Sequence, residues 1–531
     1  MAEQSSAPVL ESLSHLEPLF PASTSTKALI ALAIIVVIAA SSAHFNNVHE
    51  REPPVLRSWV PFIGHLVGMI RQRSNYLPSL ASKYGLPIAS LPILNGKVYA
   101  IWDGSLIQAV YRNKNLSFVP FVIEFAQREL GYGAEHDKIV KESGLMDEFF
   151  DEIHKGMAPH YVHRMNVNAL QDVAITLKSI GDNTQEIPNV WLWIRDLMTL
   201  ATCKGLYGPE NPIGPDLLDL VWDFERDLAQ LMFFPLPQYS ASKSYNARAK
   251  LQAVLNDYYA RKGDHHEDAA GITRHRADVL RKFGVQSAEV GIFEVALLHV
   301  ATSNTIPTLF WFMMHIVSRP ELVDRLREEV SHVAVSNGSN IRTVNVQTLA
   351  NECPLLVSCY REAIRICNRA EGQRKVMKET TISDGKGRSY LLKEGTNIQM
   401  SAETVHNLQQ VWGEDATEFN PDRFLEQVKG LNNENVKAQR TSYIPFGGGR
   451  HLCPGRNFAM AENLGFMVAF ILGFEVSSMD GKPFVLPIME QRSMTSAVCK
   501  PLGEGEGFGM QVKRREGWEQ VDWQFTSGAS S

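Results

Sequence analysis

The stretch Phe446-Gly-Gly-Gly-Arg-His-Leu-Cys453-Pro-Gly455-Arg456 carries the most information about fold and chemistry. Its glycines allow backbone turns that a Cβ atom would forbid, so that amide N–H groups can point at the Cys453 sulfur. A helix is predicted over 455–472, and its positive N-terminal end would face the thiol. Both effects lower the pKa of a thiol and favour a metal-binding thiolate. A structural cysteine buried in a glycine-rich turn is the alternative that the residues alone leave open.

Five positions of this stretch resemble FxxGx[RH]xCxG, the haem-ligand loop of the cytochrome P450 (haem-thiolate) family. The matching residues are Phe446, Gly449, His451, Cys453 and Gly455. The resemblance implies that these residues surround haem b and that the Cys453 thiolate is the axial ligand of the haem iron. It also implies the cytochrome P450 fold, which is mostly α with a small β region.

Two more motifs resemble the family and stand in its usual order. The sequence Glu362-Ala-Ile-Arg365 is similar to the ExxR helix, and Phe419-Asn-Pro-Asp-Arg423-Phe is similar to the FxPxRF segment. Alone, a charged pair at i and i+3 of a helix contributes only about 0.2–0.5 kcal/mol. The resemblance implies more, because in the family Glu362, Arg365 and Arg423 would form a buried ion-pair network that holds the cysteine loop.

The resemblance also implies which cations bind the haem propionates. Arg374 stands where relatives place a propionate ligand, and His451 is the second candidate. Many relatives carry a WxxxR motif near residues 120–140 for the same purpose. The chain has that pattern at Trp191 to Arg195, too late in the sequence, so we regard this occurrence as chance.

The apolar stretch 287–318 resembles the family's long helix above the haem, but its usual [AG]GxxT pattern is altered. Counting back from the helix end puts the alcohol position on Asn304 and the acid position on Ser303. A register shifted by one puts Asn304 at the acid position and Thr305 at the alcohol position. Ser303, Asn304 and Thr305 are therefore the predicted catalytic residues. Pro307 lacks an N–H for the Ser303 carbonyl, which predicts a kink.

The resemblance implies a monooxygenase that uses O2 and electrons from NADPH–cytochrome P450 reductase to hydroxylate or otherwise oxidise a lipophilic small molecule. The chain contains no GxGxxG and no Walker loop, so the electrons must come from a separate protein. The cysteine loop and the sequence Arg514-Arg-Glu-Gly-Trp518 resemble fungal biosynthetic members, which implies terpenoid, alkaloid or polyketide secondary metabolism.

The distal stretch Ala301-Thr-Ser-Asn-Thr-Ile-Pro307 leaves a second function open. It resembles a branch of the family that includes bile-acid sterol hydroxylases and prostacyclin synthase. That branch contains both monooxygenases and oxygen-independent isomerases. A haem-thiolate isomerase or dehydratase that needs no reductase is therefore the alternative.

Composition agrees with a globular enzyme. The 531 residues are 44% apolar and 21% charged, close to globular averages, which excludes a disordered or fibrous chain. The formal net charge of -6 gives no support for a nucleic-acid partner, which usually needs a basic face. Six cysteines in a chain of this length are too few for a disulfide scaffold.

The N-terminal sequence predicts a membrane anchor. The uncharged run from Ala28 reaches 16 residues at Ala43, with Phe45 just beyond, and is only slightly shorter than the about 20 residues that cross a bilayer. Basic residues follow the run, so the positive-inside rule places the body in the cytosol. We therefore expect a lumenal segment (1–27), a single transmembrane anchor (28–45) in the endoplasmic reticulum membrane, a proline-containing linker (46–60) and a catalytic domain (61–531). A cleaved signal peptide is the alternative.

Periodicity predicts a helical body with two β regions. A hairpin is expected over 86–102 around Asn95-Gly96, and a second β pair over 374–400. The segment from Gly263 to Arg276 is expected to be a solvated loop, and the last 50 residues short strands and loops. Helices are expected over 161–181, 215–232, 244–262, 287–318, 320–335, 354–368 and 455–472.

Overall fold

The structure is a computed structural model that describes residues 32, 49–60, 63–72, 75–94, 96–338, 340–490 and 496–528. The predicted anchor over 28–45 lies outside these ranges except for Leu32. Among the described residues no single helix is long and apolar enough to cross a bilayer. One bent pair, Gly271–Lys282 with Ser287–Val317, meets the length and composition criteria at an angle of 118°.

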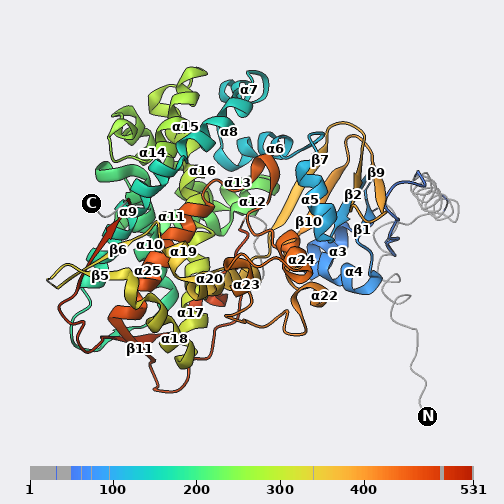
Figure 1. The fold of residues 1–531 in the computed structure, drawn as a ribbon. Helices are drawn as coiled ribbons and strands as arrows, with labels where there is room; N and C mark the ends of the chain where they lie inside the picture. Colours follow the sequence, from blue (N-terminus) through green and yellow to red (C-terminus); the bar gives the residue numbers. More distant parts are fainter. Residues whose placement is uncertain are drawn as a thin grey trace, which may run out of the picture.

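Helices form most of the molecule, and the family-like mostly α architecture is confirmed (Figure 1). In the first half they are α3 (Leu66–Gln72), α4 (Tyr76–Tyr84), α5 (Gly104–Arg112), α6 (Val119–Leu130), α7 (Ala134–Glu142), α8 (Leu145–Gly156), α9 (Pro159–Lys178), α10 (Val190–Tyr207), α11 (Leu218–Arg226), α12 (Leu228–Phe233), α13 (Pro237–Ser240) and α14 (Ser242–Ala260).

The second half of the chain supplies the remaining helices. They are α15 (Gly271–Lys282), α16 (Val290–Thr302), α17 (Thr305–Val317), α18 (Pro320–Val330), α19 (Leu349–Glu352), α20 (Pro354–Cys367), α21 (Ala402–His406), α22 (Gln409–Trp412), α23 (Leu425–Val428), α24 (Glu434–Ser442) and α25 (Arg456–Gly473). Single helices were correctly predicted near α9, α14, α18, α20 and α25.

The largest sheet joins distant parts of the chain. Its order is β1 (Ile88–Ile93), β2 (Gly96–Ile101), β10 (Asn397–Ser401), β7 (Glu371–Val376) and β3 (Leu116–Ser117). β1 and β2 form the predicted antiparallel hairpin, and β10 lies parallel to β2, with Asn397 opposite Val98. Figure 1 shows this sheet on one side of the molecule and the helical part on the other.

Three smaller sheets complete the β structure. The pair β8 (Thr380–Ser383) and β9 (Ser389–Leu392) is antiparallel. A second small sheet has the order β11 (Phe474–Ser478), β12 (Met510–Arg514), β4 (Gln185–Ile187). A third has the order β13 (Asp522–Thr526), β6 (Ile341–Asn345), β5 (Ala334–Ser336). Strands β12 and β13 confirm the prediction for the last 50 residues.

Three expectations need correction. The predicted helix over 287–318 is two helices, α16 and α17, with a break at Ser303 and Asn304, because Pro307 cannot supply the N–H that would continue the first helix. The expected helix over 215–232 is likewise two, α11 and α12. The predicted loop over 263–276 contains the start of α15, and Asp264 there is fully buried in an ion pair with Arg281.

Candidate active site

The cysteine loop turns back on itself before α25. The Cys453 N–H donates to the Phe446 carbonyl over 3.0 Å, and the Leu452 N–H donates to the Gly449 carbonyl over 3.1 Å. One Arg456 guanidinium nitrogen donates to the Cys453 carbonyl over 2.9 Å. These bonds hold the sulfur just before the first turn of α25, as the glycine pattern predicted.

Close packing against α5 explains why glycine is needed in this loop. Gly449 has φ +66°, a left-handed conformation that side chains rarely adopt, and a Cβ there would lie 2.2 Å from the Tyr111 carbonyl oxygen. A Cβ on Gly448 would lie 2.2 Å from the Tyr111 ring. The glycines therefore allow α5 to approach the loop that carries Cys453.

The expected low thiol pKa is not a property of the loop by itself. Burial raises the pKa of Cys453 above its ordinary value, although the backbone N–H groups of Gly455 and Arg456 and the Arg456 charge lower it. Desolvation of the anion outweighs the helix end and the glycine turn. A coordinating metal ion deprotonates a thiol outright, so the thiolate would form together with iron ligation.

Arg374 and His451 lie side by side beside the loop. Arg374, on β7, donates to the Gly448 carbonyl over 3.1 Å, and its guanidinium lies 5.2 Å from the Tyr111 ring centre. Burial, and then the Arg374 charge, lowers the pKa of His451 to about 4. Arg374 also donates to the Gln373 carbonyl over 2.7 Å, but no carboxylate pairs with its buried side chain in the described part of the chain, and His451 Nδ1 is buried without a hydrogen-bond partner.

An unpaired buried guanidinium is costly unless an anion binds to it. The carboxylates of a haem are anions of the required kind, and Cys453 provides the thiol for the iron. The residues present therefore fit haem b, with Arg374 and His451 placed to bind its propionates and Cys453 its iron.

Helix α8 supplies residues that the sequence analysis missed. The ring of Phe150 meets the ring of His451 edge-on, with centroids 4.9 Å apart. His154, one turn later, lies 3.2 Å through Nε2 from the Arg450 carbonyl oxygen. An aromatic residue followed four positions later by a basic one has the spacing of the missing WxxxR motif, which is the signal that could have found them.

The network behind the loop contains all three residues expected there. Arg365 Nε donates to Glu362 over 2.7 Å, and Arg423 Nε donates to the other oxygen of the same carboxylate over 2.8 Å. Arg365 also donates to the carbonyls of His406 and Ala416, each over 2.5 Å. Glu362 and Arg365 are fully buried, so every charge in the network depends on its partners.

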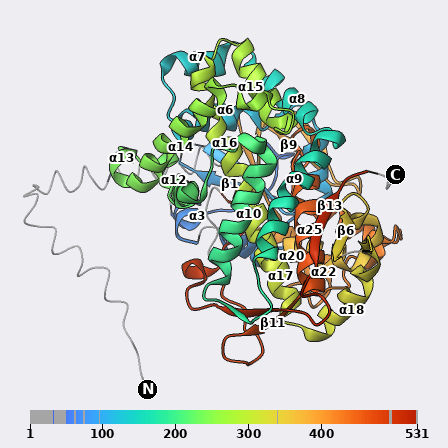
Figure 2. The ribbon, with the colours of Figure 1, turned by 90° about the vertical axis from the view of Figure 1, so that its left-hand side faces the viewer.

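Helix α16 is mostly buried, but one of its faces is accessible. Ile292 and Ala296 are half-buried, Val300 is 57% exposed, and the next position with this spacing, Asn304, is again half-buried. The spacing of four places these residues on one face. Figure 2 shows α16 running through the interior of the molecule. An accessible apolar face on a central helix is suited to an apolar ligand.

The three predicted distal residues differ in what their side chains do. The Asn304 Oδ1 accepts from the N–H groups of Ala497 and Val498, over 2.9 and 3.1 Å. Asn304 Nδ2 donates to the Ser303 hydroxyl over 3.3 Å. The Thr305 carbonyl accepts from Asn463 on α25, but within the described ranges its hydroxyl has no hydrogen-bond partner.

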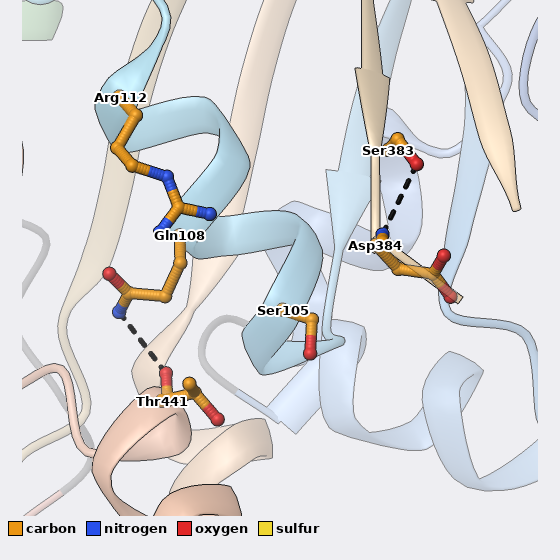
Figure 3. Close-up of a pocket in the computed structure, with 7 residues that line it drawn as sticks. Ser105, Gln108, Arg112, Ser383, Asp384 and Thr441 are labelled. Atoms are coloured by element: carbon orange, nitrogen blue, oxygen red, sulfur yellow. Dashed lines mark hydrogen bonds between the residues drawn. The ribbon is translucent and has the colours of Figure 1, made fainter. Parts of the chain in front are cut away.

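Two other polar groupings lie apart from this site. Asp264, His265 and Asp278 have the spacing of metal ligands, but the Arg281 guanidinium donates to all three and so occupies their centre. A pocket of about 290 Å³ lies between α5, the turn after β8 and the end of α24 (Figure 3). None of the predicted site residues lines it; its lining consists of Ser105, Gln108, Arg112, Ser383, Asp384, Gly385 and Thr441.

A mostly helical fold with a glycine-held cysteine, and with a buried arginine that donates to the same loop and has no carboxylate partner among the described residues, fits a haem-thiolate protein. Comparison with known proteins agrees. The family model described as "Cytochrome P450" matches residues 53–501. The chain therefore belongs to the cytochrome P450 family; it is a monooxygenase of that family, and its cofactor is haem b.

Individual relatives place it more closely. A "Cytochrome P450 monooxygenase" of Gibberella zeae is 42% identical over 94% of this chain and 96% of its own. The "25-hydroxycholesterol 7-alpha-hydroxylase" of Rattus norvegicus is 29% identical over 40% of this chain and 53% of its own. The predicted resemblances to fungal members and to sterol hydroxylases are thus confirmed.

A solved structure agrees on the fold. It is titled "Retinoic acid bound cyanobacterial CYP120A1" and has a TM-score of 0.64 at 16% identity. The match covers 87% of this chain and 99% of the cyanobacterial one. At this identity the likeness is one of fold alone.

Proposed function

We propose that the protein inserts one oxygen atom of O2 into a lipophilic small molecule of secondary metabolism, with electrons from NADPH–cytochrome P450 reductase. The observation that carries the substrate class is the accessible apolar face of α16, formed by Ile292, Ala296 and Val300. When bound, haem supplies the iron on which O2 is activated, and the Cys453 thiolate favours cleavage of the O–O bond.

The proton supply is proposed to use Thr305. An uncharged amide is a poor proton donor, and the Asn304 oxygen is already occupied by two backbone N–H groups. The hydroxyl of Ser303 accepts from Asn304. Of the two hydroxyls, on Ser303 and Thr305, that of Thr305 is left without a partner in the described ranges, and it can both accept and donate a proton.

Membrane association is proposed through the anchor over 28–45, with the catalytic domain over 61–531 in the cytosol. An exposed apolar segment supports a second contact with lipid. Phe233, Phe234, Leu236 and Tyr239 lie at or between α12 and α13, at the edge of the molecule in Figure 2, and are 40 to 79% exposed. Such a cluster on an otherwise polar surface is typical of a membrane or protein contact.

The test is turnover of purified holoprotein with a panel of lipophilic compounds, with and without reductase and NADPH. We expect products heavier than their substrates by one oxygen atom, formed only when both are present. Reductase-independent turnover with no gain in mass would instead indicate the isomerase or dehydratase.

Protease digestion of intact microsomes tests the topology, because a cytosolic body is digested and a lumenal one is protected.

A further inference from the structure

The pocket beside α5 is lined without any apolar side chain. Its volume of about 290 Å³ is close to the lower end of the about 300–1,000 Å³ typical of small-molecule sites. Ser105, Gln108 and Arg112 follow one another at intervals of three and four residues, so they lie on one face of α5. Figure 3 shows this row on one side of the gap and Ser383 and Asp384 on the other. Such a lining suits a polar or charged ligand and not the lipophilic substrate proposed for the active site.

Most of the free hydrogen-bonding groups in this pocket are donors. The Ser383 hydroxyl accepts from the Gly385 N–H over 3.2 Å, which leaves its own proton free to donate. The Ser105 hydroxyl and the Arg112 guanidinium have no hydrogen-bond partner among the described residues. A guanidinium has donors and no acceptor. These three groups together match a ligand that offers acceptor oxygens.

The carboxylates next to the pocket already have partners. Arg388 donates from Nε to Asp384 over 2.6 Å and from Nη2 to Asp103 over 3.1 Å. The other Asp384 oxygen accepts from the N–H groups of Lys386 and Arg388, over 2.8 and 3.1 Å. Asp384 is therefore held by its own turn, and its charge is balanced by Arg388 and not by Arg112.

Exposed cations without an ion pair in the described ranges surround the pocket. Arg112 lines it, and Lys386 lies in the turn that closes it. Lys114 and Lys378 lie close by, because β3, just after Lys114, pairs with the end of β7, just before Lys378. Charges of one sign around a hollow raise the local concentration of the opposite ion. The pocket is therefore electrostatically suited to an anion.

We propose that this pocket binds a phosphate group, carried by a soluble metabolite or by a lipid headgroup. The Arg112 guanidinium can bind two phosphate oxygens at once. Hydroxyl donors on both walls, from Ser105 and Ser383, match the tetrahedral oxygens of a phosphate better than the two oxygens of a carboxylate. The site lies apart from Cys453 and goes beyond the monooxygenase proposal.

The position of the pocket permits either source of the phosphate. Its wall opposite α5 belongs to the hairpin of β8 and β9, and the Leu391 N–H on β9 donates to the Arg51 carbonyl over 2.8 Å. The predicted anchor ends a few residues before Arg51. The anchor would therefore bring this hairpin near the lipid headgroups, while soluble metabolites reach the pocket from the solvent.

The experiment is isothermal titration calorimetry of the full-length holoprotein in phosphatidylcholine vesicles. The probe is sn-glycerol 3-phosphate, and glycerate is its carboxylate counterpart. We expect saturable binding of glycerol 3-phosphate, with a Kd about tenfold lower than that of glycerate. In Arg112→Gln the Kd of glycerol 3-phosphate should rise about tenfold, because a hydrogen bond between charged groups is lost. Ser105→Ala removes a neutral donor and should raise it about threefold.

Matched variants separate the pocket from the general charge of the surface. Lys513→Gln removes an exposed cation from β12, in a different sheet, and should leave the Kd unchanged. Arg112→Lys keeps the charge but loses the planar fork, so its Kd should lie between those of the wild type and Arg112→Gln. Equal Kd values for glycerol 3-phosphate and glycerate, equal effects of Arg112→Gln and Lys513→Gln, or no saturable heat would overturn the proposal.

The lipid composition of the vesicles identifies the source of the phosphate. A headgroup in the pocket competes with the probe, so vesicles with phosphatidic acid should raise the apparent Kd of glycerol 3-phosphate above that in vesicles given equal charge by oleate. A soluble source predicts the same Kd in both. Either result supports the phosphate site and assigns its source. These titrations need no turnover, so their failure leaves the monooxygenase proposal standing.

Discussion

Two regions near the cysteine loop, the ion-pair network and the break in the distal helix, are held together by different interactions. Behind the loop, the buried side chains of Arg365 and Arg423 form ion pairs with the same carboxylate, that of Glu362. In front of it, the break at Asn304 is filled by an amide that binds the backbone of Ala497 and Val498. The network depends on each charged partner being present, whereas the break at Asn304 depends on one amide oxygen that accepts two backbone N–H groups.

The largest effect should come from breaking the network behind the loop. Glu362→Ala and Arg365→Ala each leave buried charge unpaired, at a cost of about 3–5 kcal/mol. We expect both variants to lack haem, which is measured by the haem absorption per polypeptide. Arg325→Ala breaks an ion pair with Asp422 whose side chains are nearly half-exposed, and should cost less than about 1 kcal/mol. Normal haem content in both network variants would show that the network does not hold the loop.

In front of the loop, Thr305→Val should slow product formation about a hundredfold, because it removes the hydroxyl proposed to supply protons. Peroxide release per NADPH should rise as oxygen leaves before its bond is cleaved. Thr305→Ser should restore most of the activity. In Thr308→Val the lost hydroxyl is one that donates to the Asn304 carbonyl, so turnover there should change little. Equal losses in Thr305→Val and Thr308→Val would contradict the role of Thr305.

At the edge between the two sides, Arg374→Met should speed haem loss about tenfold, since it removes a charged hydrogen-bond donor worth about 1.5–3 kcal/mol. The rate is measured by transfer of haem to excess apomyoglobin. Lys375→Met, on the next position of β7, points to the opposite face of the strand and serves as the control. An unchanged rate in Arg374→Met would mean that the propionates lie elsewhere.

The pH dependence of stability tests the network side through His406, which lies beside Arg365. Burial, and then the Arg365 charge, lowers the pKa of His406 to about 3, against about 6.5 when unfolded. The unfolded chain therefore gains a proton that the native state does not, and stability falls as pH drops from about 6.5 toward 3.

The loss is about 1.4 kcal/mol per pH unit for one such histidine. Removing it in His406→Gln should reduce the slope of unfolding free energy against pH by that amount, as measured by urea unfolding between about pH 4 and 6. The exposed His332→Gln should leave the slope unchanged. Equal slopes in His406→Gln and the wild type would show that His406 titrates alike in both states.

More of the residues behind the cysteine loop than of those in front of it could be predicted from the sequence. The glycine-rich turn and its resemblance to the family's haem-ligand loop located Cys453, and the resemblance of the ExxR and FxPxRF motifs located Glu362, Arg365 and Arg423. Pro307 predicted the kink in the distal helix. The ion pair between Glu225 on α11 and Lys500 was missed, because its partners lie far apart in the chain and neither has a local pattern.

In the fold as well, elements with local sequence signals were predicted, and a segment fixed by tertiary contacts was not. Long helices such as α9 and α14, and the hairpin of β1 and β2, were predicted because their signals are local. The dense charges of the segment 263–276 predict a solvated loop. Tertiary contacts overturned that reading, since Arg281 pairs with Asp264 and Arg276 with Glu294 in the interior.

The absorption spectrum of the reduced, carbon monoxide-bound protein tests the central claim most directly, because it reports the ligand on the iron. With Cys453 as the axial thiolate, the wild-type protein should show the red-shifted band typical of thiolate ligation, and Cys453→Ala should lose it. A wild-type spectrum without that band, or a Cys453→Ala protein that keeps it, would contradict the assignment of the haem-thiolate site.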